Sequence, residues 1–335
     1  MHRIAIIGLG QIGASIGMDL RAKLPDVEII GHDIEPSTAG IARKKGAVDQ
    51  VSYSLPGTVD DASIVFIAVP VTAMKNVMGA IGPSLSPGAI VTDTASTKVD
   101  VMSWADELLP ESVEFVGGHP MAGVETPGVD GAQSGLFEDA TYAIMPLARS
   151  AESAVKTVVD LVTLLGAKHY FMDPDEHDGL VAAVSHLPIA LSITLMRSAS
   201  SSPSWREMAG LAAGSFRDVS RLASGSPAMH HGIFSTNKES ILRWIDQYQD
   251  DLNGFRRLIE LGGEPLMNGL LEAFDARDNW IRGKVVETEA HKAYDEIPTT
   301  SENIMGAFGG DRLAQLGRRI SQKEQEIESR RDRGT

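Results

Sequence analysis

The stretch RIAIIGLGQIGASIGMDL, residues 3 to 20, decides the fold, because a short apolar run meets three glycines and then a helical pattern. Gly8, Gly10 and Gly13 form the pattern G-x-G-x-x-G directly after the predicted strand. The first glycine permits a tight turn, the second lets a pyrophosphate approach the backbone, and the third lets the helix pack closely on the strand. The sequence therefore predicts a strand, an anion-binding turn and a helix.

A carboxylate follows this turn at the distance that a dinucleotide site requires. The second predicted strand, VEIIGHD at 27–33, ends in Asp33, twenty residues after Gly13. Such a carboxylate accepts both ribose hydroxyls of NAD and repels the 2′-phosphate of NADP, so the predicted cofactor is NAD. Asp33 as an ordinary surface or capping residue remains an alternative. The predicted cofactor-binding residues are Gly8, Gly10, Gln11, Ile12, Gly13, Asp33, Val69 and Pro70.

The first half of the chain alternates apolar runs with helical stretches. These runs are RIAIIG, VEIIGHD, SIVFIAVP, AIVTDT, VEFVGG, TYAIMP and AKHYFM, the last ending at Met172. The alternation predicts an α/β, Rossmann-type doubly wound parallel sheet over residues 1–172. Helical spacing then dominates, so residues 173–310 are predicted to form an all-α helical domain, followed by a charged C-terminal tail at 311–335.

The composition limits the possible partners and compartments. The 335 residues carry a formal net charge of −15, which argues against nucleic acid and against anionic membrane surfaces. The absence of cysteine suits a reducing cytoplasm and excludes thiolate chemistry. We expect no signal peptide, no apolar run of roughly 18 residues and hence a cytoplasmic protein.

A histidine occupies a stretch rich in glycine and proline, GGHPMAGVE at 117–125. Gly117 and Gly118 are expected to turn the backbone off the strand end, and Pro120 to hold His119 extended in a loop. His119 would then emerge at the ligand-binding edge of the sheet, where an imidazole can take a proton from a hydroxyl whose carbon gives up hydride. A histidine satisfied by local hydrogen bonds is the alternative.

The second half offers groups for an anionic substrate. The segment GSFRDVSR at 214–221 presents Asp218 and Arg221, and a guanidinium binds carboxylates through two parallel hydrogen bonds. VSHLPIA at 184–190 adds His186 in a helical context. No cluster of metal ligands is found, so no metal is predicted.

Taken together, these motifs resemble the prephenate and arogenate dehydrogenase family. The resemblance rests on the glycine fingerprint, AVPV, DTASTK, GGHPMAGVETPGVDGAQSGLFEDATYAIMP, EHDGLVAAVSHLP and GSFRDVSR, in that order over roughly residues 1–285. It implies NAD-dependent oxidative decarboxylation of prephenate to 4-hydroxyphenylpyruvate in tyrosine biosynthesis. It also implies a homodimer formed through the helical domain.

The resemblance assigns roles by position. His119 corresponds to the catalytic histidine, Ser96 to its hydrogen-bonding companion, and Arg221 to the ligand of the substrate carboxylate. It further implies that Glu125, His186 and Asp218 line the substrate pocket.

Departures from the family pattern leave the substrate open. A second histidine often follows HLP in the family, where this chain has Ile189, and an aromatic residue is often found where it has His230. An arogenate dehydrogenase that gives tyrosine directly is therefore an alternative. A β-hydroxyacid dehydrogenase is less favoured, because the run from Glu176 to Met196 lacks the lysine typical of that family. A nonenzymatic NAD-binding protein would have no need of His119 or Arg221.

Overall fold

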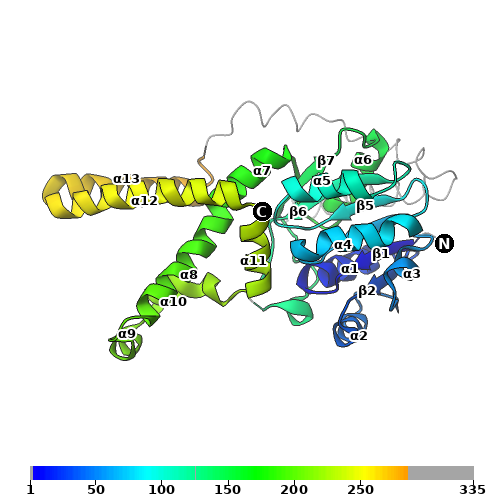
Figure 1. Ribbon diagram of the computed structural model, residues 1–335, viewed down its shortest axis with the longest axis horizontal. Coiled ribbons are helices and arrows are strands. Elements are labelled where there is room, and N and C mark those ends of the chain that lie inside the picture. The colour runs from blue at the N-terminus through cyan, green and yellow to red at the C-terminus, as the bar shows by residue number, and fades with distance from the viewer. Residues whose placement is uncertain (1–2, 125, 286–335) are drawn as a thin grey trace, which may run out of the picture.

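The computed structural model describes residues 3–124 and 126–285, which form a sheet covered by helices and a helical part that extends away from it (Figure 1). The strands are β1 (Arg3–Ile7), β2 (Glu28–His32), β3 (Gln50–Val51), β4 (Ile64–Ile67), β5 (Ile90–Asp93), β6 (Glu114–Pro120), β7 (Thr141–Pro146) and β8 (Lys168–Phe171). The helices that accompany the sheet are α1 (Gln11–Lys23), α2 (Pro36–Lys44), α3 (Leu55–Val59), α4 (Val71–Ile81), α5 (Val99–Leu108) and α6 (Glu152–Leu164), with the short 3-10 turns η1 (Gly82–Ser84) and η2 (Gly128–Gly131).

The sheet has the order β3-β2-β1-β4-β5-β6-β7-β8. Strands β1 to β6 are parallel, as the alternating pattern predicts, but β7 pairs with β6 in the antiparallel direction and β8 runs parallel to β7. The predicted doubly wound parallel sheet is confirmed, except that its last two strands run opposite to β1–β6. The reason is that the β6–β7 connection contains only the short turn η2 and no helix that would carry the chain back across the sheet.

Both faces of the sheet are covered, because successive residues of a strand point to opposite faces. Ile4 and Ile6 of β1 join the core under α1, α2 and α6, whereas Ala5 and Ile7 join the core under α3, α4 and α5. Each fully buried isoleucine contributes about 1.5–3 kcal/mol of transfer free energy. These two apolar layers fix the carboxyl ends of β1, β2, β4, β5 and β6 at one edge of the sheet.

His119 lies inside strand β6 and not in a loop, since it pairs with Ala143 of β7. Gly117 and Gly118 also lie within the strand, and neither has a positive φ. The glycines are needed for close packing: a Cβ at Gly117 would lie 2.6 Å from Met102 Sδ, and one at Gly118 would lie 2.7 Å from the Asp93 carbonyl oxygen. The antiparallel pairing with β7 thus extends β6 past the point where the sequence predicts a turn.

The second part is helical, in agreement with the sequence. Its elements are α7 (Pro174–Val181), η3 (Ala182–His186), α8 (Leu187–Ser200), α9 (Trp205–Leu211), α10 (Gly214–Ser220), η4 (Arg221–Ser224), α11 (Pro227–Thr236), α12 (Lys238–Leu261) and α13 (Gly263–Ile281). The η3 segment is a π-helical turn that joins α7 to α8 without a break. Residues 286–335 lie outside the described part, so the domain end at 310 and the tail at 311–335 stay predictions.

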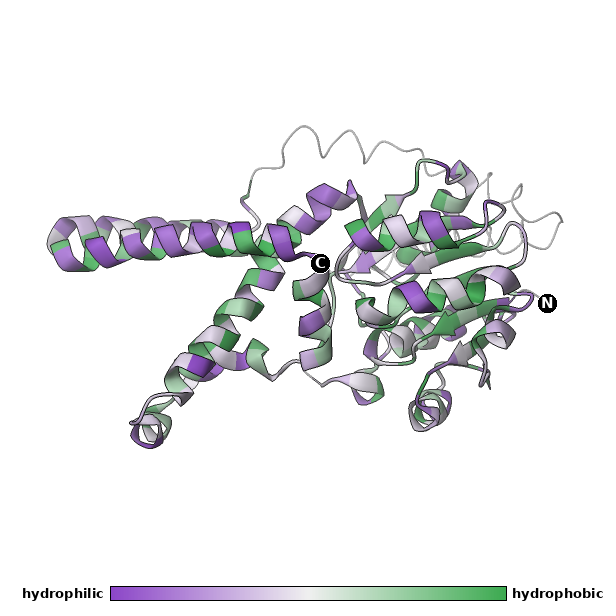
Figure 2. Ribbon diagram, viewed as in Figure 1, coloured by the Kyte–Doolittle hydropathy of each residue, from purple (hydrophilic) through white to green (hydrophobic). Residues whose placement is uncertain are grey.

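Helices α12 and α13 form a hairpin that projects from the rest of the molecule (Figure 1), and hydrophobic and hydrophilic residues alternate along it (Figure 2). Within the described residues, α12 buries only Ile241 and α13 buries none. Large apolar side chains stay exposed on the hairpin, namely Leu242, Trp244, Tyr248, Leu252, Phe255, Ile259, Leu261, Met267, Leu270, Leu271, Phe274, Trp280 and Ile281. A single chain leaves this apolar surface in water.

One helical segment of the described part, Pro174–Ser200, is long and apolar enough to cross a membrane by length and composition alone, a test that core helices also pass. Ser185, His186, Ser192 and Thr194 interrupt its apolar residues, so the segment contains no unbroken apolar run of 18 residues. Polar contacts bind it to its neighbours: Trp244 Nε1 donates to the Gly179 carbonyl, and the Ala223 amide donates to Ser192 Oγ.

Candidate active site

The glycine turn has the shape of an anion cradle. Gly8 adopts φ +90°, and a Cβ there would lie 2.4 Å from the Ala68 carbonyl oxygen. A Cβ at Gly13 would lie 1.9 Å from the Gly8 carbonyl oxygen, whereas a Cβ at Gly10 meets nothing within 4 Å. Gly10 is the N-cap of α1 and supplies no side-chain cap, so the first amides of that helix face open space. The residues present therefore fit a dinucleotide pyrophosphate.

The other predicted cofactor residues gather around this turn. Asp33 is half-buried just beyond β2, and its carboxylate accepts from the Leu9 amide at 2.8 Å and from the Glu35 amide at 2.9 Å. Val69 Cγ1 would be 3.0 Å from a Cβ at Gly8, and Pro70 caps α4. One carboxylate oxygen is thus anchored to the glycine turn itself.

Gln11 ties the glycine turn to the segment after β6. Its side-chain amide donates to the carbonyls of Val124 at 3.0 Å and Thr126 at 2.6 Å, and its Oε1 accepts from the Val124 amide at 3.1 Å. The predicted cofactor loop and the predicted substrate loop are therefore joined. Glu125, predicted to line the pocket, lies outside the described residues.

His119 belongs to a chain of buried polar groups that crosses from the sheet to the helical part. Its Nδ1 lies 2.8 Å from Nε2 of His177, and His177 Nδ1 lies 2.8 Å from Oδ1 of Asp178. His177 is 0% exposed, Asp178 2% and His119 8%. Among the described residues, no hydrogen bond engages His119 Nε2. One ring nitrogen is thus held, and the other is left for a ligand.

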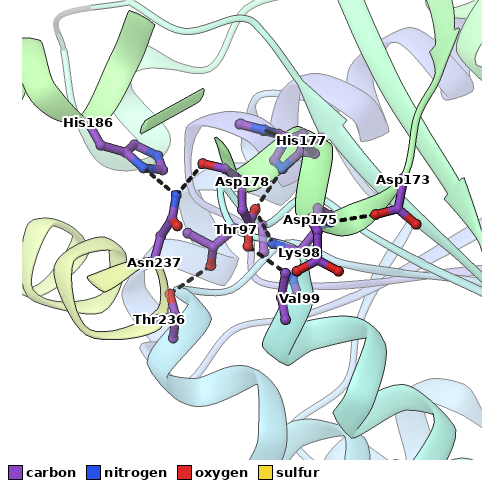
Figure 3. Close-up of polar contacts among 12 residues, drawn as sticks. Thr97, Lys98, Val99, Asp173, Asp175, His177, Asp178, His186, Thr236 and Asn237 are labelled. Carbon is purple, nitrogen blue, oxygen red and sulfur yellow. Dashed lines mark hydrogen bonds and ion pairs between the residues drawn. The ribbon is translucent and has the colours of Figure 1, made fainter. Parts of the chain in front are cut away.

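Asp178 is the junction of this network (Figure 3). Its carboxylate accepts from the backbone amides of Lys98, the N-cap of α5, at 2.8 Å and of Val99, the first residue of α5, at 3.0 Å. Its backbone carbonyl accepts from Asn237 Nδ2 at 2.7 Å, and the same amide nitrogen lies 3.2 Å from His186 Nδ1. Beside Asn237, the Oγ1 atoms of Thr97 and Thr236 lie 2.7 Å apart and share a hydrogen bond.

A buried lysine completes the site beneath His119. Lys98 is 0% exposed, and its ammonium donates to the Asp93 carboxylate and to the Gly118 carbonyl. Asp93 Oδ1 in turn accepts from the Gly118 amide at 3.1 Å. The ion pair of Lys98 and Asp93 therefore holds both the amide and the carbonyl of Gly118, the residue before His119. The sequence analysis missed Lys98 because lysine is rarely buried, although DTASTK places it five residues after Asp93.

Burial keeps the imidazoles of His119 and His186 uncharged. It lowers the pKa of His119 well below the ordinary 6.5, and the nearby His177, Lys98 and His186 act in the same direction. Burial also lowers the pKa of His186 to about 4, against the opposing attraction of Asp178. The pKa of Lys98 is lowered by burial too, while Asp93 acts to raise it. His119 is thus a neutral base at neutral pH.

The structure brings together only some of the predicted substrate residues. His186 is fully buried and joins the His119 network through Asn237. Ser96 follows β5 at the same edge of the sheet, but no hydrogen bond joins it to His119, whose partner is His177. Asp218 and Arg221 lie exposed on α10 and η4. His177 and Asp178 were missed, although EHD in the sequence holds both.

A doubly wound nucleotide-binding fold, an anion cradle and a neutral histidine at the sheet edge define an oxidoreductase of the dinucleotide-dependent class. The family described as "Prephenate dehydrogenase, nucleotide-binding domain" matches residues 16–171, and "Prephenate dehydrogenase, dimerization domain" matches residues 173–275. The chain belongs to the prephenate dehydrogenase family.

Individual relatives agree with this assignment. The chain is 32% identical to a prephenate dehydrogenase of Bacillus subtilis over 97% of this chain and 89% of that protein. It is 33% identical to a cyclohexadienyl dehydrogenase of Zymomonas mobilis over 82% of this chain and 94% of that protein. The structure of the A. aeolicus prephenate dehydrogenase with hydroxyphenyl propionate and NAD+ matches with a TM-score of 0.78 and 28% identity, covering 83% of this chain and 98% of that one.

The glycine turn allows a matched pair of variants. Gly10→Ala should leave the melting temperature nearly unchanged but weaken NAD binding by at least tenfold, because its methyl group enters only the open cradle. Gly13→Ala should lower the melting temperature, because its methyl group collides with the Gly8 carbonyl. Thermal melts and NAD titration by intrinsic fluorescence would measure both. Normal NAD binding by Gly10→Ala would show that the pyrophosphate does not bind at this glycine turn.

His186 should make stability depend on pH. Its folded pKa of about 4 lies below the unfolded value of 6.5, so the unfolded chain binds the extra proton first as the pH falls. The contribution of His186 is fully present above pH 6.5 and is lost as the pH approaches 4, by on the order of 3 kcal/mol. Denaturant unfolding at fixed protein concentration should show a steeper pH dependence for the wild type than for His186→Gln. Parallel curves for the two proteins would contradict this.

Proposed function

We propose that this chain catalyses the NAD-dependent oxidative decarboxylation of prephenate to 4-hydroxyphenylpyruvate, the dehydrogenase step of tyrosine biosynthesis. The observation that carries the proposal is His119, a neutral imidazole at the ligand-binding edge of the sheet with Nδ1 held by His177 and Nε2 left for a substrate. The curated relatives named prephenate dehydrogenase and the related structure with NAD+ bound support it.

The cofactor is NAD, which supplies the hydride acceptor when it is bound. Gly8, Gly10 and Gly13, with the N-terminus of α1, would hold the pyrophosphate. Asp33 would accept the ribose hydroxyls, and Gln11, Ile12, Val69 and Pro70 would line the remainder of the cofactor site.

His119 is the proposed catalytic base. The hydroxyl O–H bond on the substrate ring breaks and its proton forms a new bond to Nε2 of His119, while the hydrogen on the same carbon leaves as hydride to the bound nicotinamide. The ring carboxylate then leaves as carbon dioxide, its electron pair makes the ring aromatic, and the ring oxygen takes the proton back from His119. The formation of the aromatic ring provides the driving force. The burial of His119 and its distance from bulk water keep the imidazole neutral until this proton arrives. The described residues contain no group of potential metal ligands, and this reaction needs none.

The remaining substrate contacts are proposals from the family resemblance. Arg221 would bind the side-chain carboxylate, and Ser96, at the same edge of the sheet as His119, would hydrogen-bond with the substrate. His186, Glu125 and Asp218 would complete the pocket. Since Arg221 and Asp218 are exposed on α10 and η4 in the isolated chain, we propose that bound substrate covers them.

Arogenate is the second candidate substrate. The Synechocystis arogenate dehydrogenase structure is 31% identical to this chain, with a TM-score of 0.70, and covers 83% of it. Ile189, which replaces a histidine often found in the family, is buried in the helical core with Ala182, Ile233 and Ile241. Purified protein given NAD with either prephenate or arogenate, followed by NADH absorbance, distinguishes the two.

We also propose a homodimer through the helical domain, residues 173–310, in the cytoplasm. The match to a dimerization domain supports this, as does the apolar surface that α12 and α13 leave exposed. Large exposed apolar patches on a folded domain usually belong to an interface. The nucleotide-binding domain would span residues 1–172.

The first test changes the proposed base. His119→Asn should lower kcat by about 10²- to 10⁴-fold with little change in KM, because asparagine keeps a polar contact but cannot take the proton at neutral pH. The acid limb of the wild-type kcat/KM, which reports the free enzyme, should lie well below pH 6.5, in line with the lowered pKa of His119. Arg221→Gln is the contrasting variant: KM for the substrate should rise roughly tenfold or more while NAD binding is kept. Near-normal turnover of His119→Asn would remove His119 from the reaction.

The dimer can be tested by charge placed on α13. Wild-type protein should sediment at twice the 35.8 kDa chain mass. Leu271→Glu with Phe274→Glu should shift it toward the monomer, because two carboxylates would be buried without partners. Tyr53→Glu, at an exposed aromatic residue of the nucleotide-binding part, is the matched control and should stay dimeric. A wild-type mass that stays monomeric at all concentrations would refute the dimer.

A further inference from the structure

The protonation of the His119 network can be read from its hydrogen bonds, starting at Asp178. This carboxylate accepts from two backbone amides at the N-terminus of the ten-residue helix α5. The Lys98 amide donates to Oδ1 and the Val99 amide to Oδ2, so both carboxylate oxygens act as acceptors. An ionised carboxylate can only accept hydrogen bonds.

The next link follows from that constraint. His177 Nδ1 lies 2.8 Å from Asp178 Oδ1, so Nδ1 must carry the proton and donate it. In neutral His177 the other nitrogen, Nε2, then has a lone pair and accepts. Its neighbour at 2.8 Å is His119 Nδ1, which must be the donor. The proton of neutral His119 is therefore on Nδ1, and the lone pair is on Nε2.

We propose that His177 and Asp178 are positioning residues that fix His119 in the tautomer whose Nε2 can accept the substrate's hydroxyl proton. This inference rests on the proposed function of His119 and names the residues that make it a base. Once Nε2 has taken the proton, the His119 ring is positive, and the hydrogen bond from Nδ1 to His177 becomes charge-assisted. The carboxylate of Asp178 lies at the far end of the same chain of hydrogen bonds.

The other charged and titratable groups around the two rings do not supply this function. Lys98 is committed to Asp93 and the Gly118 carbonyl, and its positive charge opposes protonation of His119. His186 contacts Asn237 through Nδ1, and Asn237 in turn donates to the backbone carbonyl of Asp178 and not to its carboxylate. Among the described residues, His177 is thus the group that determines which nitrogen of His119 is protonated.

The first experiment reads the tautomer directly. The full-length protein, labelled with ¹⁵N at histidine, is studied by long-range ¹H–¹⁵N correlation NMR at neutral pH, and the His119 signals are assigned by their loss in His119→Asn. We expect the Nδ1-protonated tautomer at His119 and also at His177. The Nε2-protonated tautomer at His119 would overturn the inference, and this measurement requires neither turnover nor a folded variant at position 177.

The second experiment changes the donor and acceptor at position 177. His177→Phe keeps a ring but removes both nitrogens, so His119 should populate both tautomers, and kcat should fall by roughly 10- to 100-fold with KM changed less than about threefold. The pH at which kcat falls on the acid side should also change, because the protonated His119 ring loses its hydrogen-bond acceptor, Nε2 of His177. His177→Gln supplies an amide oxygen and an amide nitrogen, and should recover part of the lost kcat.

The control is His169→Phe, the same substitution in β8, where the ring packs against Phe171 outside the network. It should leave kcat and its pH profile unchanged. Unaltered kcat and acid limb in a folded His177→Phe protein would refute the positioning role. Failure of the wild type to oxidise either substrate would refute the proposed function alone, because the tautomer of His119 would still be measured.

Discussion

The carboxylate of Asp178 on the N-terminus of α5 is the interaction on which the rest of the site depends. It belongs to a helix that follows the last strand, yet its two acceptor bonds go to the backbone of Lys98 and Val99, about eighty residues earlier. A helix N-terminus has amides with no partner inside the helix, so a buried one must find acceptors elsewhere. By supplying them, Asp178 fixes the helical part against the sheet edge and brings its neighbour His177 to His119.

A second buried charge stabilises the other side of the same site. The ion pair of Lys98 and Asp93 has no exposure to solvent, and both groups also bind the backbone of Gly118. Breaking such a pair on one side leaves an uncompensated charge in the interior, at a cost of about 3–5 kcal/mol. The end of β6 is therefore held more rigidly than strand pairing alone would hold it, which limits the orientations open to the His119 ring.

The sequence predictions that succeeded were those that depend on residues close together in the chain. The roles of Gly8, Gly10 and Gly13 depend on neighbours within a few residues, so their spacing was sufficient to predict the turn. The direction of β7 and the position of His119 within β6 were mispredicted, because both depend on pairing between segments that the chain order does not specify. The His177 contact joins residues 58 positions apart, and Lys98 is buried against the usual preference of lysine. No periodicity in the sequence could reveal either one, though the adjacent His and Asp of EHD were a signal.

The π-helical turn η3 changes the rotation of α8, about the helix axis, relative to α7. Because an α-helix has 3.6 residues per turn, one additional residue in a turn rotates everything after it by about 100°. The face of α7 that carries His177 and Asp178 toward the sheet is thereby set at a fixed rotation from the face of α8 that packs against η4. Deleting one residue from η3 would therefore turn α8 by about 100° relative to α7, so that Ser192 could no longer meet the Ala223 amide while His177 still faced His119.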